Sequence, residues 1–315
     1  MKTVAIILAG GNSSRMKFLK NKIFMEMCGK PIISHLIDNL HKADINNIVV
    51  VSNKQNYNNL HSMHPECLYA MQEKPNGTGG ALMACKELLC QYDKALIING
   101  DGPIICPQLL QKLVKKSNAD LTILTHIVDM HSTNGRVLRD NKKIVGLIEF
   151  KDANKKQKLI KEGNAGVYVF NVKKLLKNID KLTAANAQNE LYITDYVKIF
   201  AQQGYNVKSL QMPQENNYFS VNTMHEFNVQ NKKMQSDIKN KLIENGVFFI
   251  YPDSVYVDCD VKIGYGSVIF GGVQMFGKTV VGDGCVIGAN SVLCDCVLSP
   301  YTMLEAGTIL KHKKL

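Results

Sequence analysis

The chain has 315 residues, 45% of them hydrophobic, so it is long enough for one large domain or two moderate ones with full cores. The formal net charge is +11, but the lysines are spread along the chain and no aromatic residues alternate with basic ones, so we expect no nucleic-acid partner. No apolar run reaches 18 residues, and the nine cysteines form no zinc or disulfide pattern, which predicts a cytoplasmic protein without membrane insertion.

The first two thirds of the chain alternate predicted strands and helices. Continuous apolar runs predict strands at 3–9, 46–53, 94–100 and 120–128. Apolar residues at helical spacing predict helices at 31–43, 79–89 and 106–117. This alternation is typical of an α/β domain with a doubly wound, mostly parallel sheet covered by helices on both faces.

From about residue 136 the pattern changes. A hairpin is predicted at 135–150, turning near Asp140 and Asn141, and a strand at 164–171. A helix is predicted at 189–204, ending at Gly204. Such an insertion typically closes the side of an α/β cleft.

A bridging helix is predicted at 223–245. Thr223 and Glu226 match a capping box, and Gly246 stands where a helix stops. Its predicted core face consists of Met224, Phe227, Met234, Ile238 and Leu242.

The last segment is a repeat with a period of six residues. Every sixth position is aliphatic at Val257, Ile263, Ile269, Met275, Val281, Ile287 and Leu293. This period is typical of a short left-handed parallel β-helix, whose flat apolar faces favour a partner. We therefore predict an α/β domain at 1–222, a linking helix at 223–246 and the β-helix at 247–315.

The loop after the first strand, in LAGGNSSRMKFLKNK, is the first candidate site. Ligands of doubly wound sheets bind where strands end, and Gly10 and Gly11 let the backbone approach phosphates closely. Arg15 and Lys22 supply two cations for a nucleoside triphosphate. The stretch matches neither GxxxxGK[ST] nor GxGxxG, and a glycine-rich turn with two surface cations remains an equally good interpretation.

Two oxygen ligands could hold a metal ion. Asp101 follows the predicted strand at 94–100, and a single carboxylate there suits Mg²⁺, which one or two protein oxygens plus phosphates usually bind. Asn222, just before the bridging helix, could add a neutral oxygen. Capping of a turn or of the helix is the alternative role for each.

Three further polar stretches could contact substrate. Gly77 and Thr78 stand at a predicted helix start, where backbone N–H groups could read a base edge or a phosphate. Glu149 and Asn164 could hydrogen-bond the hydroxyl or amide groups of a sugar. A tight turn and ordinary strand-end residues are the alternatives.

The sequence contains no pattern of a catalytic nucleophile and base, neither HExxH nor GxSxG. This suits attack by a sugar phosphate on another phosphate, because the attacking group is already an anion and needs no deprotonation.

Taken together, these stretches resemble the nucleotide-sugar pyrophosphorylases. LAGGNSSRM with Lys22 resembles LAAGxGTRM…K, QEKPNGTGGA resembles QxxxxGTGxA, and NGDGPII resembles YGDVPLI. NGRVL…IVGLIEFKDA, EGNAGVYVFN and NAQNELYITD are similar to YGRI…VxxIVEHKDA, EINTGIYxFD and NAQGEYYLTD. With the six-residue repeat, almost the whole chain resembles the bifunctional N-acetylglucosamine-1-phosphate uridylyltransferase/glucosamine-1-phosphate acetyltransferase family.

The resemblance implies a fold of the nucleotide-diphospho-sugar transferase type and Mg²⁺-dependent uridylyl transfer from UTP to N-acetylglucosamine 1-phosphate. It also implies a homo-oligomer, with a trimer formed through the β-helix. By motif position, it implies that Arg15 and Lys22 hold the phosphates and that Asp101 and Asn222 hold Mg²⁺. The implied contacts of the nucleotide are Leu8, Gly10, Gly11, Gln72, Gly77 and Thr78. The implied contacts of the amino sugar are Gly135, Glu149 and Asn164.

The chain departs from the family pattern at several positions. Ser13 replaces a loop glycine, Asn99 a tyrosine and Pro75 a glutamine. LAGGxSSRM also resembles the molybdenum-cofactor nucleotidyltransferases, which have glycine where Lys17 stands here and lack the β-helix. Another NTP or sugar phosphate, and a non-catalytic paralogue that binds a nucleotide sugar, therefore remain alternatives.

The family's acetyl-transfer residues lie in later coils and in a C-terminal extension. This sequence carries about three coils, so we expect no acetyltransferase activity.

Overall fold

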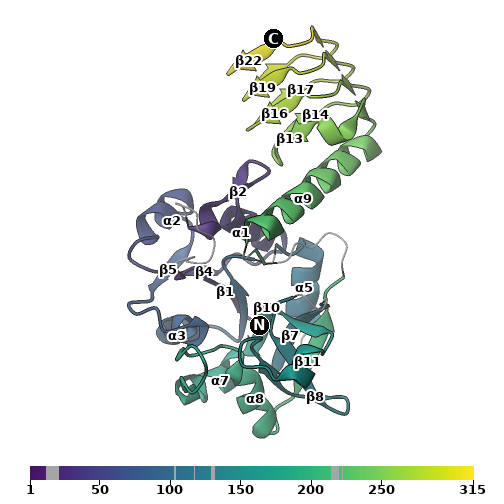
Figure 1. Ribbon diagram of the computed structural model, residues 1–315. Helices are drawn as coiled ribbons and strands as arrows, with labels where there is room; N and C mark the ends of the chain where they lie inside the picture. Colours follow the sequence, from purple (N-terminus) through teal and green to yellow (C-terminus); the bar gives the residue numbers. More distant parts are fainter. Residues whose placement is uncertain (12–20, 103, 117, 129–131, 214–219, 222) are drawn as a thin grey trace. The chain divides into compact units, whose positions relative to one another are not determined.

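The computed structural model describes residues 1–11, 21–102, 104–116, 118–128, 132–213, 220–221 and 223–315 (Figure 1). Contacts divide the chain into two compact units. The first comprises Met1–Ile23 and Ile32–Val221, and the second comprises Phe24–Pro31 and Asn222–Leu315. Every helix in the described ranges is too short or too polar to span a bilayer.

A mixed, mostly parallel sheet forms the centre of the first unit. Its order is β11 (Val207–Gln211), β7 (Leu121–Ile127), β10 (Glu162–Asn171), β6 (Lys94–Asn99), β1 (Thr3–Leu8), β4 (Ile48–Ser52) and β5 (Leu68–Met71). Strand β1 pairs in parallel with β4 and β6, whereas β10 is antiparallel to β6 and β7. The predicted α/β fold with a mostly parallel sheet is confirmed.

The predicted hairpin also forms. Strands β8 (Arg136–Asp140) and β9 (Lys143–Ile148) are antiparallel, and Asn141 at their turn has a φ of 53°. Asparagine tolerates this left-handed conformation better than most residues. The hairpin joins the sheet through β10, where Arg136 pairs with Gly163.

Helices surround the sheet of the first unit. They are α1 (Ile32–Lys42), α2 (Tyr57–Met63), α3 (Thr78–Met83), α4 (Lys86–Leu89), α5 (Pro107–Lys116), α6 (Lys155–Lys158), α7 (Val172–Leu176) and α8 (Asp195–Gln202), with 3₁₀ turns at Lys22–Phe24 and Ile179–Lys181. Alternate residues of a strand face opposite sides of a sheet. Ile6 packs in the cluster that includes α3 and α8 residues, yet its neighbours Ala5 and Ile7 are also buried, so both faces are covered.

Two helix predictions were wrong in extent. The helix expected at 79–89 is interrupted around Ala84 and Cys85, which separate α3 from α4. The helix expected at 189–204 begins only at Asp195, because backbone groups before it bond to the loop preceding α3 and to the first turn of α3. Leu191 N donates to Asn76 O at 2.8 Å, and Gly79 N donates to Leu191 O at 2.7 Å. The helix ends before Gly204, as predicted.

The second unit contains the bridging helix α9 (Met224–Glu244) and a hairpin of β2 (Glu26–Met27) and β3 (Lys30–Pro31). The predicted capping box is present, since the Thr223 and Glu226 side chains each accept a bond from the other's backbone N–H. Cys28 N, in the hairpin, donates to Asn231 Oδ1 of α9 at 3.1 Å.

The predicted core face of α9 is only partly confirmed. Phe227 and Met234 are buried, and Ile238 and Leu242 pack against the core of the coils that follow. Met224 is exposed, because the core contacts of α9 begin one turn later, at Phe227.

Three stacks of short parallel strands form the β-helix. They are β12 (Phe248–Phe249), β15 (Val268–Ile269), β18 (Val286–Ile287) and β21 (Met303–Leu304); β13 (Tyr256–Val257), β16 (Gln274–Phe276), β19 (Val292–Cys294) and β22 (Ile309–Lys311); and β14 (Lys262–Ile263), β17 (Val280–Val281) and β20 (Val297–Leu298). All seven aliphatic residues of the repeat are buried. The next aliphatic position of the repeat, Leu298, follows Leu293 after five residues, so one coil is a residue shorter.

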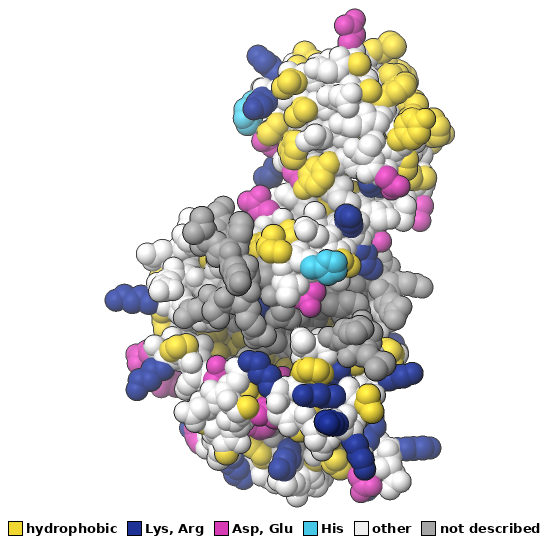
Figure 2. All heavy atoms as spheres, viewed as in Figure 1, with side chains coloured by type: hydrophobic (Ala, Val, Ile, Leu, Met, Phe, Trp, Pro, Cys, Tyr) yellow, Lys and Arg dark blue, Asp and Glu magenta, His cyan; other side chains and the backbone are white. Residues whose placement is uncertain are grey.

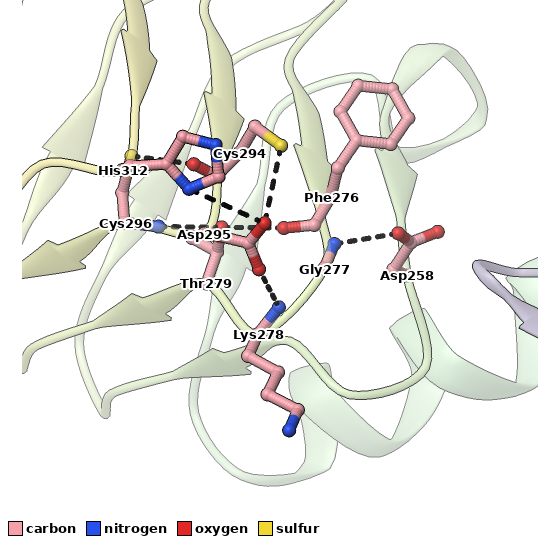
Figure 3. A network of polar contacts seen from close by, with 9 residues as sticks. All are labelled: Asp258, Phe276, Gly277, Lys278, Thr279, Cys294, Asp295, Cys296 and His312. Atoms are coloured by element: carbon pink, nitrogen blue, oxygen red, sulfur yellow. Dashed lines mark hydrogen bonds and ion pairs between the residues drawn. The ribbon is translucent and has the colours of Figure 1, made fainter. Parts of the chain in front are cut away.

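Glycines and aspartates form the corners of this β-helix. A Cβ on Gly282 would lie 2.5 Å from Pro300 N of the next coil, so only glycine allows the coils to stack this closely. At another corner Asp258 accepts a bond from Gly277 N at 2.8 Å, and Asp295 accepts one from Lys278 N at 2.9 Å (Figure 3). These carboxylates bind N–H groups that the strands leave unpaired.

Candidate active site

The carboxyl ends of β1 and β6 bring the predicted metal carboxylate beside the predicted phosphate loop. Gly100 N donates to Leu8 O at 2.8 Å, so the ends of the two strands are joined. Directly after Gly100, Asp101 forms an ion pair with Lys22. Lys22 Nζ also donates to Val221 O at 3.4 Å, and Val221 N donates to Asp101 O at 3.2 Å. A cation and an anion are thus placed together at the sheet edge, where ligands of such folds bind.

Several predicted residues lie outside the described residues. These are Arg15, Asn222, Ser13 and Lys17. Their predicted roles stay predictions.

The predicted base-binding residues lie together. Gln72 follows β5, and its Nε2 donates to Gly77 O at 3.0 Å. Its Oε1 lies against Gly10, 2.4 Å from where a Cβ on that glycine would stand. Gly77 has a φ of 100°, and Thr78 directly after it begins α3. The loop after β1 and the loop before α3 are therefore linked through Gln72.

The predicted sugar-binding residues form a second group. Asn164 N donates to Gly135 O at 2.9 Å, and a Cβ on Gly135 would lie 3.6 Å from Glu149 Oε2. The Asn164 side chain donates to Tyr168 Oη at 2.7 Å and accepts from Gly166 N at 3.0 Å. Its orientation is therefore fixed.

The electrostatics of this group keep the buried phenol neutral. Burial raises the pKa of Tyr168, and the charge of Glu149 raises it further, so Tyr168 remains protonated and can accept from Asn164 while keeping its own proton.

A segment that the sequence analysis did not assign to the site joins the two groups. Ile193 N donates to Thr78 Oγ1 at 3.1 Å, and Thr194 Oγ1 donates to Glu149 Oε1 at 3.0 Å. Tyr192 directly precedes Ile193, and burial, followed by the charges of Asp152 and Glu149, raises its pKa to about 12. In the described part of the chain its buried hydroxyl has no hydrogen-bond partner. The NAQNELYITD motif could have assigned this segment to the site, but the sequence analysis placed most of its residues in a predicted helix.

Asn99, a departure from the family pattern, lies at the same sheet edge. It is the last residue of β6, and its Nδ2 is 2.9 Å from where a Cβ on Gly166 would stand. Among the described residues, nothing bonds its buried Oδ1. The carboxamide therefore offers an acceptor close to the Asn164 group.

The donor set fits a divalent cation that shares its ligands with substrate. The described ranges contain no group of three or more His, Cys, Asp or Glu side chains placed to hold a metal ion. One carboxylate at Asp101 is the arrangement in which Mg²⁺ keeps water and phosphate oxygens as its other ligands.

Comparison with known proteins gives the family. Residues 5–193 match the MobA-like NTP transferase domain. Proteins named bifunctional protein GlmU are 36% identical over 313 residues in Limosilactobacillus reuteri and 33% identical over 317 residues in Clostridioides difficile. These matches cover 98% and 99% of this chain and 69% of each relative.

A solved structure shows the same fold. It is a protein from Bacillus anthracis named as a glucose-1-phosphate thymidylyltransferase, with a TM-score of 0.62 and 23% sequence identity. The match covers 73% of this chain and 94% of that one. At this identity the likeness supports the fold alone. The sequence matches lead to one conclusion: the chain belongs to the family of the bifunctional protein GlmU, and its residues 5–193 form a MobA-like NTP transferase domain.

Proposed function

We propose that this chain is a UTP-dependent N-acetylglucosamine-1-phosphate uridylyltransferase, which makes UDP-N-acetylglucosamine and pyrophosphate. One observation supports this most strongly. The segment with Ile193 and Thr194 hydrogen-bonds to Thr78 of the nucleotide group and to Glu149 of the sugar group. This segment would hold a nucleotide and a sugar phosphate near each other, and we assign their reacting phosphates to the pair of Lys22 and Asp101.

In the proposed reaction, a phosphate oxygen of the sugar phosphate attacks the α-phosphorus of UTP. A new P–O bond forms, the bond from the α-phosphorus to the bridging oxygen breaks, and its electron pair leaves with pyrophosphate. No proton transfer is needed, so the contribution of the protein is positioning and charge stabilisation. Lys22 neutralises the reacting phosphates, and Gln72 and Gly77 orient the base.

Asp101 would hold Mg²⁺, with Asn222 as the second proposed ligand. When bound, the ion supplies charge stabilisation for the phosphate oxygens. The choice of Mg²⁺ over other divalent cations belongs to this proposal.

The test is pyrophosphate release from a matrix of four NTPs and several sugar 1-phosphates with Mg²⁺. We expect the highest kcat/KM with UTP and N-acetylglucosamine 1-phosphate. If only a nucleotide other than UTP is turned over, the assignment of UTP as substrate is wrong, as the molybdenum-cofactor-type alternative requires. Binding of a nucleotide sugar without turnover of any pair would favour the non-catalytic paralogue.

The expected lack of acetyl transfer stays a prediction. Consumption of acetyl-CoA with glucosamine 1-phosphate measures it directly, and any consumption above background contradicts it.

A further inference from the structure

Directly after β1, at Ala9–Gly11, asparagine side chains bond the backbone carbonyls. The β1–β4 ladder ends where Ala9 N donates to Val51 O at 2.8 Å. Beyond it, the next three carbonyls each accept a bond from an asparagine side chain. Asn56 Nδ2 donates to Ala9 O at 3.2 Å, Asn53 Nδ2 to Gly10 O at 2.9 Å, and Asn21 Nδ2 to Gly11 O at 2.7 Å.

Two of these asparagines are themselves fixed by the start of α2. Asn53 Oδ1 accepts from Asn56 N at 2.8 Å, so its carboxamide bridges the first turn of the helix and the loop. Asn56 is 6% exposed and directly precedes α2. Asn21 Oδ1 accepts from Ile23 N at 3.3 Å, in the turn that carries Lys22. The loop is therefore held by the elements on either side of it.

Fixing a carbonyl also fixes the N–H group of the same peptide unit. In a planar trans peptide the C=O and the following N–H point in opposite directions. With the carbonyls of Ala9 and Gly10 turned toward Asn56 and Asn53, the N–H groups of Gly10 and Gly11 point away from them. Successive N–H groups presented in this way bind anions.

Glycine makes such a loop costly to order. Gly10 and Gly11 have the largest backbone freedom of any residue type, and a triphosphate that had to order them would bind more weakly. Hydrogen bonds to their carbonyls remove that freedom before the ligand arrives.

We propose that Asn21, Asn53 and Asn56 are positioning residues that preorganise the loop at Ala9–Gly11 for the triphosphate of the nucleotide. This rests on the proposed function, since it assumes that the loop binds a nucleoside triphosphate. The asparagines act through the backbone, so they set affinity for the triphosphate and not for the sugar phosphate.

The test replaces each asparagine by leucine, which has nearly the same shape and no donor. Asn47→Leu is the matched control, because Asn47 Nδ2 donates to Thr3 O at 3.2 Å, at the other end of β1. Binding of UTP with Mg²⁺ and of inorganic tripolyphosphate is measured by calorimetry, and KM for UTP and for the sugar phosphate by pyrophosphate release. Urea unfolding reports the stability of each variant.

Loss of one such hydrogen bond should raise Kd for UTP and for tripolyphosphate about three- to ten-fold in Asn53→Leu, Asn56→Leu and Asn21→Leu. KM for UTP should rise in parallel, while KM for the sugar phosphate and the affinities of Asn47→Leu stay at wild-type values. If the substitutions at Asn53 and Asn56 impair folding, Asn21→Leu still tests the proposal.

Unchanged Kd values in folded variants, or equal losses for UTP and sugar phosphate, would overturn the positioning role. Failure of the wild-type chain to bind UTP or tripolyphosphate would instead refute the proposed function. The two failures are therefore distinguishable.

Discussion

Lys22 and Asp101 neutralise each other in the structure, and both are partly shielded, with side-chain exposures of 13% and 25%. The substrate would bring a chain of negative charges and a cation to this pair. We expect Lys22 to move toward phosphate and Asp101 toward the cation, so that the new charges replace the existing ion pair. The charged pair is then already placed for both ligands.

Gly77 should be irreplaceable for a local, steric reason. Its φ is 100°, and a Cβ there would lie 2.5 Å from Leu191 O. We expect Gly77→Ala to lower the free energy of unfolding by roughly 2–4 kcal/mol and to raise KM for UTP, because both strain and overlap act on the base loop.

Gly204→Ala is the matched control for Gly77→Ala in urea unfolding and kinetics. Gly204 also has a positive φ, 72°, but a Cβ there meets nothing within 4 Å. Gly204→Ala should lower the free energy of unfolding by about 1 kcal/mol and leave KM for UTP unchanged. Equal effects at the two positions would contradict the steric argument.

His126 should make stability depend on pH. Burial lowers its pKa to about 4, and the nearby Arg136 lowers it too, although a hydrogen bond with the Asn164 backbone acts in the opposite direction. An unfolded histidine has a pKa of about 6.5, so the unfolded state binds more protons between pH 6.5 and 4. The free energy of unfolding should fall as the pH drops through that window.

Urea titrations at several pH values measure this dependence. His126→Gln should flatten the slope between pH 6.5 and 4, whereas the same exchange at the exposed His225 should leave it unchanged. A slope that persists in His126→Gln would show that another group is responsible.

At the residue scale, residues that motif position assigned to one ligand lie close to one another where the structure describes them. Gln72, Gly77 and Gly10 meet, as do Gly135, Glu149 and Asn164. Asn53 and Asn56 could not be found in this way, because their role depends on how β4 and α2 place them beside a loop more than 40 positions earlier.

The segment at 189–194 is the element that connects the two substrate groups. Thr194→Val keeps its shape but removes the hydroxyl that donates to Glu149 Oε1. We expect KM for the sugar phosphate to rise about three- to ten-fold, because Glu149 loses an orienting bond, while KM for UTP changes little.

Steady-state kinetics with each substrate varied in turn measure the two KM values. Thr122→Val, at a buried threonine within β7, controls for loss of a hydroxyl elsewhere in the sheet. A rise in KM for UTP alone would place Thr194 in the nucleotide group instead.

Element predictions succeeded where periodicity was strong and failed where tertiary bonds competed. The repeat from Val257 to Leu293 and the buried strand at 94–100 follow directly from apolar spacing. The start of α8 does not, since Leu191 bonds to Asn76 and Gly79 far away in sequence. Local propensity contains no information about such partners.

The β-helix exposes an apolar face that a larger assembly would cover. Phe248, Val268, Val286 and Met303 stack in register on its outside, with Phe248 62% and Met303 76% exposed. Figure 2 shows hydrophobic side chains at the surface of these coils. Burial of such a face favours association.

We expect the chain to form a homo-oligomer through the β-helix, with a trimer from the family resemblance. Light scattering after gel filtration should give about three times the chain mass of 35.1 kDa. Phe248→Asp with Met303→Asp should yield monomers, because charges would be buried. Leu159→Asp should leave the oligomer intact, because Leu159 is an apolar residue of the other unit and is 66% exposed. A monomeric wild type would contradict this expectation.

At the scale of the whole chain, the order of elements and the repeat were sufficient to predict an α/β fold followed by a β-helix. The assignment of the β2–β3 hairpin to the second unit was not predictable. It follows from contacts between residues some 200 positions apart, such as the bond between Cys28 and Asn231 and the ion pair between Lys30 and Asp260.

The central claim is metal-dependent nucleotidyl transfer at the pair of Lys22 and Asp101. Its most direct test is the rate of pyrophosphate release from UTP and N-acetylglucosamine 1-phosphate in Asp101→Asn. Asp180→Asn is the control, since it alters an exposed lysine–aspartate pair with Lys86 elsewhere in the same unit. We predict that kcat falls by roughly three orders of magnitude in Asp101→Asn with the fold intact, and stays near wild type in Asp180→Asn. Near-normal turnover by Asp101→Asn would contradict the account.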